Sequence, residues 1–324
     1  MKKQQIVIIG GGAAGFFTAV NAARINLQAE IILLEKSNKL LSKVRVSGGG
    51  RCNVTHACFD NAELVKNYPR GGKELRQAFS RFSVNDTIRW FEERGVELHT
   101  ENDGRMFPVT NNSQTIIDCL LHEAEQYKVR IRTGCEVTGI EKVNNKFNLL
   151  VSLSGDEGGE HTLTADNILV ACGGHPKSAA YDFIRKTGHT IVEPVPSLFT
   201  FNMPGNKITQ LMGLSSEPVL VRIPGTKEGQ EGALLITHWG MSGPAVLKTS
   251  AWAARTLYDT GYKFDARLSW LPKMKEEELR DFLSGLREQE GPKQVASFSP
   301  FHLPRRLWEF LLQKSGIERT ILTR

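Results

Sequence analysis

A glycine-rich segment, V-S-G-G-G-R-C-N-V-T at residues 46–55, places three glycines directly before a cation, a thiol and an amide. Glycine loses more backbone entropy on folding than any other residue, so three in a row destabilise a fold unless the conformation needs them. We expect Gly48, Gly49 and Gly50 to let the backbone run against a flat bound ring system and to offer it amide hydrogens. The segment therefore predicts a ligand contact.

The side chains that follow these glycines supply the chemistry. Arg51 can balance negative charge on a reduced ring, and Asn53 can either hydrogen-bond the edge of a ring or fix the loop. Arg51 can also lower the pKa of the neighbouring Cys52 thiol and make it reactive, although a small thiol in a glycine loop more often packs as a buried hydrophobe. We take Arg51 and Asn53 as candidate catalytic residues and interpret Cys52 as a packing residue.

A second glycine motif, G-G-G-A-A-G, begins at Gly10 and matches G-x-G-x-x-G. In this motif Gly10 allows a tight turn, Gly12 lets a pyrophosphate approach the backbone, and Gly15 packs a helix onto a strand. The amides at the helix start bind phosphates. Glu35, 20 residues after Gly15, is placed to accept hydrogen bonds from ribose hydroxyls and would repel a 2′-phosphate. A glycine turn of any α/β protein is the alternative, but the context favours FAD or NAD.

These motifs need a strand, a helix and a second strand to position them. Residues 5–9 and 30–34 are continuous apolar runs, typical of strands buried on both faces of a parallel sheet. Between them, small residues recur at helical spacing and predict a helix over 14–25. Further on, the pattern predicts helices over 72–94 and over 113–127, the latter with a serine cap.

The remaining pattern divides the chain. Asn144-Asn145 is expected at the tip of a hairpin. Residues 167–174, N-I-L-V-A-C-G-G, predict another buried strand that runs into glycines and passes beneath a bound dinucleotide, with a core strand ending in a turn as the alternative. Prolines and short β-like segments follow residue 190, where we place a domain boundary, and two amphipathic helices are expected over 276–289 and 304–317.

Composition limits the class of protein. The chain has 324 residues, 40% hydrophobic and 23% charged, and a formal charge of +6, which permits an anionic ligand or an RNA surface. Its five cysteines form no C-x-x-C, so neither a disulfide framework nor a metal site is expected and a reducing cytoplasm fits best. A secretory signal at the N-terminus is a weaker interpretation than the dinucleotide motif, and no membrane span is expected.

Six strings of the sequence carry a resemblance to a known family. They are I-V-I-I-G-G-G-A-A-G, S-G-G-G-R-C-N-V-T, G-R-M-F-P-V-T, I-L-V-A-C-G-G-H-P, P-S-L-F and T-H-W-G-M-S-G-P-A-V-L. Together they resemble the YhiN/BaiN-like FAD-dependent oxidoreductases, also labelled aminoacetone-oxidase-like flavoproteins, from residue 5 to the end of the chain. The absence of a second G-x-G-x-x-G agrees with a flavin and no dedicated domain for NAD.

The resemblance implies an α/β fold: a Rossmann-type, glutathione-reductase-like FAD-binding domain over residues 1–190, with an inserted β-barrel-like and helical domain over 191–324. It also implies a set of contacts to FAD. These contacts are Gly10, Gly12, Ala13, Ala14, Gly15, Glu35, Lys36, Lys43, Ser47, Gly48, Gly49, Gly50, Arg51, Cys52, Asn53, Val137, Ala171, Cys172, Gly173 and Gly174.

The sequence departs from this family in two places. Members often carry Gly-Arg just before the lysine that matches Lys43, whereas this chain has Leu41-Ser42. Members also return from the insertion to finish the FAD domain with a glycine-rich segment containing Gly-Glu and a final helix, which is missing here. Either the chain is C-terminally truncated or that return is supplied otherwise.

Several other side chains are candidates on weaker grounds. The loop with Arg105, Phe107 and Pro108 can approach the flavin and bind an anionic substrate, or be an ordinary turn. His238, beside Trp239, can donate a proton near neutral pH, and a structural histidine is the alternative. For His175 we expect proximity to the cofactor only. The basic segment 304–314 can touch RNA, although a solvated helix face is the simpler interpretation.

The function expected from the sequence is hydride transfer through flavin N5. NAD(P)H would bind transiently at the flavin face, reduce the flavin and leave before the substrate binds, which predicts ping-pong kinetics. The partner is either a small-molecule substrate or ribosomal RNA, whose uridine would be reduced. A flavin- or RNA-binding protein without turnover is the competing interpretation. The sequence does not indicate an oligomeric state.

Overall fold

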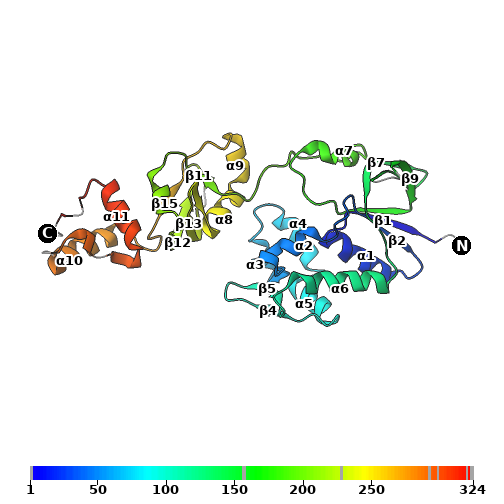
Figure 1. Ribbon diagram of the computed structural model, residues 1–324, viewed down its shortest axis with the longest axis horizontal. Coiled ribbons are helices and arrows are strands. Elements are labelled where there is room, and N and C mark those ends of the chain that lie inside the picture. Colours follow the sequence, from blue (N-terminus) through cyan, green and yellow to red (C-terminus); the bar gives the residue numbers. More distant parts are fainter. Residues whose placement is uncertain are drawn as a thin grey trace. The chain divides into compact units, whose positions relative to one another are not determined.

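The computed structural model describes residues 3–154, 158–226, 229–290, 293–297, 299–318 and 320–321. The chain divides into two compact units, Met1–Pro194 and Val195–Arg324 (Figure 1). No helix among the described residues is long and apolar enough to cross a membrane.

The first unit is built on a four-stranded parallel sheet of order β10-β1-β2-β6, of which β1 and β2 are labelled in Figure 1. The strands β1 and β2 coincide with the predicted ones, and the helix α1 between them begins one residue before the predicted start. The bounds are β1 Gln5–Ile9, α1 Ala13–Ile25, β2 Glu30–Leu34, β6 Arg130–Arg132 and β10 Asn167–Val170.

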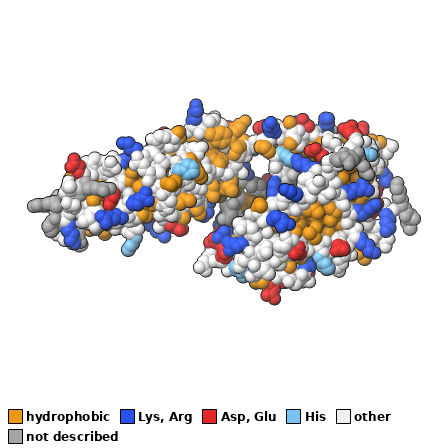
Figure 2. All heavy atoms as spheres, in the orientation of Figure 1, with side chains coloured by type: hydrophobic (Ala, Val, Ile, Leu, Met, Phe, Trp, Pro, Cys, Tyr) orange, Lys and Arg blue, Asp and Glu red, His pale blue; other side chains and the backbone are white. Residues whose placement is uncertain are grey.

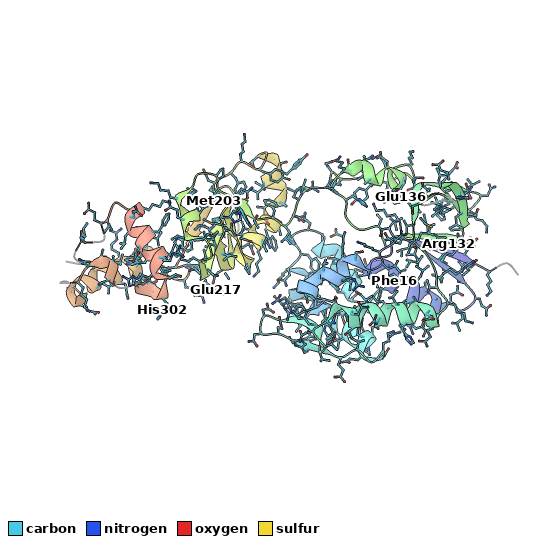
Figure 3. The ribbon with its side chains drawn as sticks, in the orientation of Figure 1. Phe16, Arg132, Glu136, Met203, Glu217 and His302 are labelled. Atoms are coloured by element: carbon cyan, nitrogen blue, oxygen red, sulfur yellow. The ribbon has the colours of Figure 1, made fainter. Side chains whose placement is uncertain are left out.

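Alternate residues of the central strands enter two different cores. Ile8 and Leu33 join the core under α1, where Phe16 (Figure 3) is fully buried. Val7 and Ile32 join the core on the opposite face. Because each strand buries both sets, its sequence is a continuous apolar run rather than an alternating one. Each fully buried aliphatic side chain contributes about 1.5–3 kcal/mol of transfer free energy.

Further helices and two small sheets complete the first unit. One antiparallel sheet has the order β3-β5-β4 and the other is the meander β7-β8-β9. The predicted hairpin tip is confirmed, since Asn144 and Asn145 join β7 to β8 with positive φ angles. The bounds are α2 Ser42–Val46, β3 Thr55–His56, α3 Asn61–Val65, α4 Gly72–Phe79, α5 Val84–Glu92, β4 Leu98–Thr100, β5 Arg105–Pro108, α6 Ser113–Gln126, β7 Cys135–Val143, β8 Lys146–Leu153, β9 Gly159–Ala165 and α7 Asp182–Arg185.

Three local predictions were wrong. The helix expected over 72–94 is two helices, α4 and α5, because Ser83 and Asp86 form a capping box that starts a new helix. The cap of α6 is Asn112, whose side chain accepts from the Gln114 amide, and not the serine. The strand β10 is an edge of the sheet and only half-buried, so the prediction of a buried strand was wrong there.

The second unit combines an antiparallel sheet with helices. The sheet has the order β11-β14-β13-β12-β15, and the helix α8 packs on β12 and β13, with Ala245 and Val246 fully buried. The two predicted amphipathic helices are confirmed as α10 and α11. The bounds are β11 Phe201–Asn202, β12 Ser215–Arg222, β13 Gly229–Ile236, β14 Gly240–Ser242, α8 Pro244–Trp252, α9 Ala254–Asp259, β15 Arg267–Ser269, α10 Glu276–Glu290 and α11 Arg305–Lys314.

Candidate functional site

The turn between β1 and α1 shows which of its glycines serve the fold and which leave space. A Cβ on Gly15 would lie 1.8 Å from the Gly10 carbonyl oxygen, and a Cβ on Gly10 would lie 2.4 Å from the Ala171 carbonyl oxygen. A Cβ on Gly12 would meet no atom within 4 Å. Gly10 and Gly15 are therefore required by the fold itself, whereas the bare surface of Gly12 faces open space.

The start of α1 offers hydrogen-bond donors that the described protein does not use. Gly12 is the N-cap residue and provides no side-chain cap, and the first turn has no acidic residue. The first backbone bond runs from the Phe16 amide to the Gly12 carbonyl, at 3.0 Å. Among the described residues, the amides of Ala13 and Ala14 have no protein partner. Free amides at the positive end of a helix dipole are typical of a phosphate site.

Glu35 lies at the end of β2 and is already partly engaged. Its Oε2 accepts from the Gly11 amide at 2.8 Å, and its Oε1 accepts from the Ser37 amide and hydroxyl at 2.9 and 2.8 Å. Burial raises the pKa of Glu35, but these hydrogen bonds outweigh burial and leave the pKa below its ordinary value. The carboxylate has about four acceptor positions, so room for one ribose hydroxyl remains.

A cavity of about 780 Å³ opens beside this turn. Three lysines line it: Lys36, Lys39 and Lys43. The Nζ of Lys43 lies 3.3 Å from the position of a Cβ on Gly173, which places this lysine against the A-C-G-G turn after β10. The first residues of β7, Cys135 to Thr138, also line the cavity, and Glu136 among them is labelled in Figure 3. The exposed backbone of Gly12 and the three lysines therefore line the same cavity.

The cavity brings together most of the predicted cofactor contacts. Its lining includes Gly10, Gly12, Ala13, Ala14, Glu35, Lys36, Lys43, Val137, Ala171, Cys172, Gly173 and Gly174. It does not include Gly15, which packs against the turn, or the segment 47–53. Burial raises the pKa of Cys172 despite the nearby lysines, so its thiol is neutral at pH 7.

The predicted ring-contact loop has an unusual backbone and is anchored to β5. Gly48, Gly49 and Gly50 all have positive φ, which favours glycine. A Cβ on Gly48 would lie 2.7 Å from a ring carbon of Phe107, whereas a Cβ on Gly49 would meet nothing within 4 Å. The Val54 amide donates to the Met106 carbonyl at 2.9 Å. Gly48 therefore packs against β5, whereas Gly49 faces open space.

Arg51 is held by a carboxylate and an aromatic ring. Its guanidinium donates to Glu101 Oε1 at 2.5 Å and lies 4.0 Å from the centre of the Phe107 ring. Arg105 pairs with the other oxygen of Glu101 at 3.1 Å and with Asp103 at 2.7 Å. The hydrogen bond from Arg51 lowers the pKa of Glu101. These contacts hold the Arg51 guanidinium in one orientation.

Asn53 and Cys52 take structural positions in the same loop. When the side-chain amide of Asn53 is turned so that its nitrogen faces the loop backbone, this nitrogen donates hydrogen bonds to the carbonyls of Met106 at 3.2 Å and Thr55 at 2.9 Å. This is the loop-fixing alternative. Cys52 is 6% exposed, its amide donates to the Ser47 carbonyl, and burial raises the pKa of its thiol. A buried, protonated thiol agrees with the interpretation of Cys52 as a packing residue.

The weaker candidates fall in different places. His238 is exposed in the second unit, stacks edge-on against Trp239 at 4.4 Å, and lines neither of the two cavities described for this chain. The backbone amide of His175 donates to the hydroxyl of Tyr181 at 2.6 Å, and His175 lines the cavity beside Gly12. No group of three or more metal-ligating side chains occurs among the described residues.

Sequence reasoning missed three residues that shape this region. The sequence alone does not indicate the role of Glu101, because its partner Arg51 is 50 positions away and the pairing of β3 with β5 brings the two segments together. Ser37 follows Glu35 by two residues, a spacing that could have indicated the bond. Leu41, at a departure from the family pattern, has φ of +54° and donates its amide to the Gly11 carbonyl at 2.9 Å.

The donor set fits a flavin dinucleotide. The open face of Gly12, the free amides of α1 and the lysines match a diphosphate, and Glu35 retains an acceptor for a ribose hydroxyl. A volume of about 780 Å³ lies within the range of cofactor pockets. These observations concern the first unit alone.

Comparison with known proteins gives a family match over most of the chain. The family described as the HI0933-like protein Rossmann domain matches residues 4–307. A 3-dehydro-bile acid delta(4,6)-reductase from Clostridium scindens is 25% identical over 97% of this chain and 76% of its own length.

Two ribosomal RNA dihydrouridine synthases are similar as well. The protein from Escherichia coli is 28% identical over 98% of this chain and 75% of its own length. The protein from Haemophilus influenzae is 26% identical over 98% of this chain and 76% of its own length.

Proposed function

This chain belongs to the HI0933-like protein Rossmann-domain family and is an FAD-dependent oxidoreductase, and on that premise we propose that it carries hydride from NAD(P)H through FAD to a small organic substrate. The observation that supports the proposal most is the cavity beside Gly12. There an open glycine face, free helix amides and three lysines surround a volume suited to a dinucleotide.

Each part of the site has a separate task in this proposal. FAD, when bound, supplies hydride transfer at N5. The amides at the start of α1 and Lys43 hold the diphosphate, and Glu35 orients a ribose. Gly49 gives the ring system access to the backbone, while Arg51 balances the negative charge that reduction creates.

The class of substrate follows from the relatives. Their names denote a delta(4,6)-reductase of a 3-dehydro-bile acid and a synthase of dihydrouridine. Both names describe the saturation of a carbon–carbon double bond conjugated with a carbonyl group. We propose the same class of acceptor here: hydride adds to the β-carbon and a proton from solvent adds to the α-carbon.

Ribosomal RNA is the second candidate substrate, supported by the two dihydrouridine synthases and by the net charge of +6. On the face drawn in Figure 2, Lys and Arg side chains are scattered among other types and do not form a continuous stripe. A small molecule is the first choice in this proposal. Binding to ribosomal RNA that does not weaken with rising salt would remove the electrostatic support for the RNA alternative.

Steady-state kinetics test the proposed order of events. With no second dinucleotide motif in the sequence, NAD(P)H and substrate are expected to use the same flavin face in turn. Double-reciprocal plots at several concentrations of a conjugated enone should give parallel lines, and NADH or NADPH alone should bleach the bound flavin. Intersecting lines, or a flavin that neither nucleotide reduces, would contradict the proposal.

A further inference from the structure

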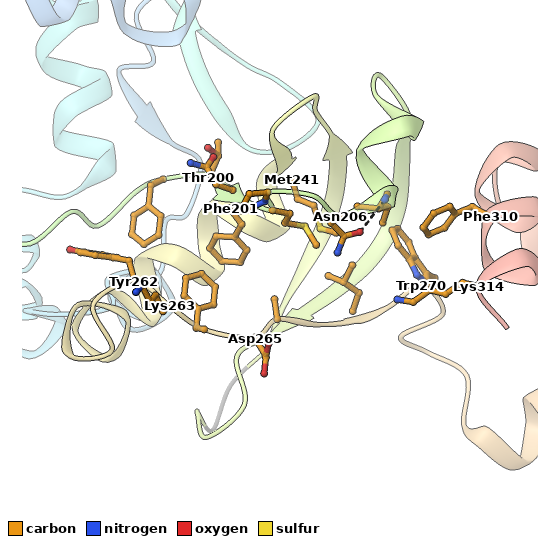
Figure 4. A pocket seen from close by; sticks show the side chains of 18 of the residues that line it. Thr200, Phe201, Asn206, Met241, Tyr262, Lys263, Asp265, Trp270, Phe310 and Lys314 are labelled. Carbon is orange, nitrogen blue, oxygen red and sulfur yellow. Dashed lines mark hydrogen bonds between the residues drawn. The ribbon is translucent and has the colours of Figure 1, made fainter.

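The second unit contains a cavity of its own, of about 1000 Å³. It lies where β11 and β15, the two outer strands of the described sheet, and the helix α11 contribute side chains (Figure 4). Its lining comes from residues 196–208, 241, 262–270 and 310–314. No residue lines both this cavity and the one beside Gly12.

Aromatic rings line this cavity. Phe199 and Tyr262 stand edge to face with centroids 5.7 Å apart, and Phe201 and Phe264 do so at 5.0 Å. Trp270 and Phe310 lie at the other end (Figure 4). Such rings offer faces and edges to a flat apolar body, which gains both from area burial and from aromatic contact.

The residues at the base of the cavity are packed into the hydrophobic core of the second unit. Phe201 is 4% exposed, Ile208 6% and Met241 2%, and all three belong to the core of the second unit. The base is therefore fixed by the fold, whereas Tyr262 on the wall is 39% exposed and accessible to a ligand. Ligand sites are typically preformed and mostly apolar in this way, with a few polar groups.

The charged side chains of the lining are two lysines and one aspartate, so their net charge is positive. Lys263 and Lys314 line opposite ends (Figure 4), and neither has an ion-pair partner among the described residues. Asn206 accepts from the Ile208 amide at 3.0 Å, which leaves its NH₂ group as a donor. The acid in the lining is Asp265, whose carboxylate points away from Met241 in Figure 4.

We propose that this cavity binds an amphipathic small molecule with a flat apolar body and one anionic group. The rings take the flat body, and Lys263 or Lys314 takes the anion, because an ammonium next to apolar walls pairs with an anion more strongly than one in open water. The proposal is independent of flavin binding, since it uses no residue of the first cavity.

Calorimetric titration with matched probes tests the proposal. The probes are 2-naphthoate and its uncharged analogue 2-naphthamide, added to the full chain with FAD present so that the first cavity does not contribute. One saturable site for 2-naphthoate is expected, with weaker binding of the amide. Lys263→Ala with Lys314→Ala should weaken 2-naphthoate on the order of tenfold and leave the amide unchanged.

Two further variants separate this site from non-specific binding. Lys248→Ala removes an exposed lysine of the second unit outside the cavity and should change nothing. Trp270→Leu should weaken both probes, because both use the ring. The proposal is overturned if 2-naphthoate shows no saturable binding, or if the double variant and Lys248→Ala affect it equally.

Discussion

At the scale of single residues, Glu35 and Arg51 are both oriented by protein groups in the first unit. Glu35 is fixed by the Gly11 amide and Ser37, and Arg51 by Glu101 and the Phe107 ring. Side chains fixed in this way lose less conformational entropy when a ligand arrives. Each arrangement therefore has a measurable consequence.

Glu35 should make the stability of the first unit depend on pH. Its pKa in the folded chain is below the ordinary value, so the carboxylate contributes stability above the unfolded pKa, and this is lost as pH falls through the folded pKa. Glu35→Gln should destabilise the chain by roughly 1 kcal/mol at pH 7. In urea titrations followed by circular dichroism, the difference in the free energy of unfolding between wild type and Glu35→Gln should disappear as pH falls below about 4. A gap that stays constant down to pH 3 would contradict this role.

Glu101 should tune the flavin through Arg51. Glu101→Gln removes the negative charge from the pair, so Arg51 would stabilise a reduced flavin more strongly. The midpoint potential should rise on the order of 30 mV, about tenfold in the equilibrium constant of a two-electron couple.

Asp103→Asn is the matched control for Glu101→Gln. It makes the same charge change two residues away but touches Arg105 rather than Arg51. Spectroelectrochemical titration should show no comparable shift for this control. Equal shifts in the two variants would mean that Glu101 acts only as a distant charge.

At the scale of elements, local spacing made β1, α1 and β2 predictable. The apolar runs, the small face of the helix and the glycine positions all lie within residues 5–35. The division between α4 and α5 depended on one capping serine, Ser83, inside an otherwise helical pattern. The contact of Arg51 with Glu101 depended on strand pairing across about fifty residues, which a single sequence does not reveal.

The turn before α1 permits a paired test of fold and binding. Gly12→Ala adds a methyl group in open space with φ of −92°, so the urea midpoint of the chain without FAD should not change. FAD affinity should nevertheless fall at least about tenfold, because the methyl group occupies the path of the diphosphate.

Gly15→Ala is the contrasting variant. Its methyl group would lie 1.8 Å from the Gly10 carbonyl oxygen, so the strain should destabilise the first unit by about 1–3 kcal/mol or more. If Gly12→Ala destabilised the chain as much as Gly15→Ala, or bound FAD as tightly as wild type, the assignment of Gly12 would be wrong.

At the scale of the whole molecule, the two units have separate hydrophobic cores. The α/β class of the first unit and the β-plus-helical character of the second were predictable, because each depends on local periodicity and on proline and glycine positions. The cavity in the second unit was not predictable, because its walls come from segments more than a hundred residues apart, such as Phe199 and Phe310.

We infer that the cavity beside Gly12 binds FAD for redox chemistry, and a spectral titration of the purified full chain tests this most directly. FAD added to the chain should bind at one molecule per chain with a shifted visible band, and the bound flavin should bleach when NADH or NADPH is added without oxygen. Gly12→Ala should lose this binding while keeping its circular dichroism spectrum. An unshifted spectrum of free FAD in the presence of folded wild-type chain would contradict the account.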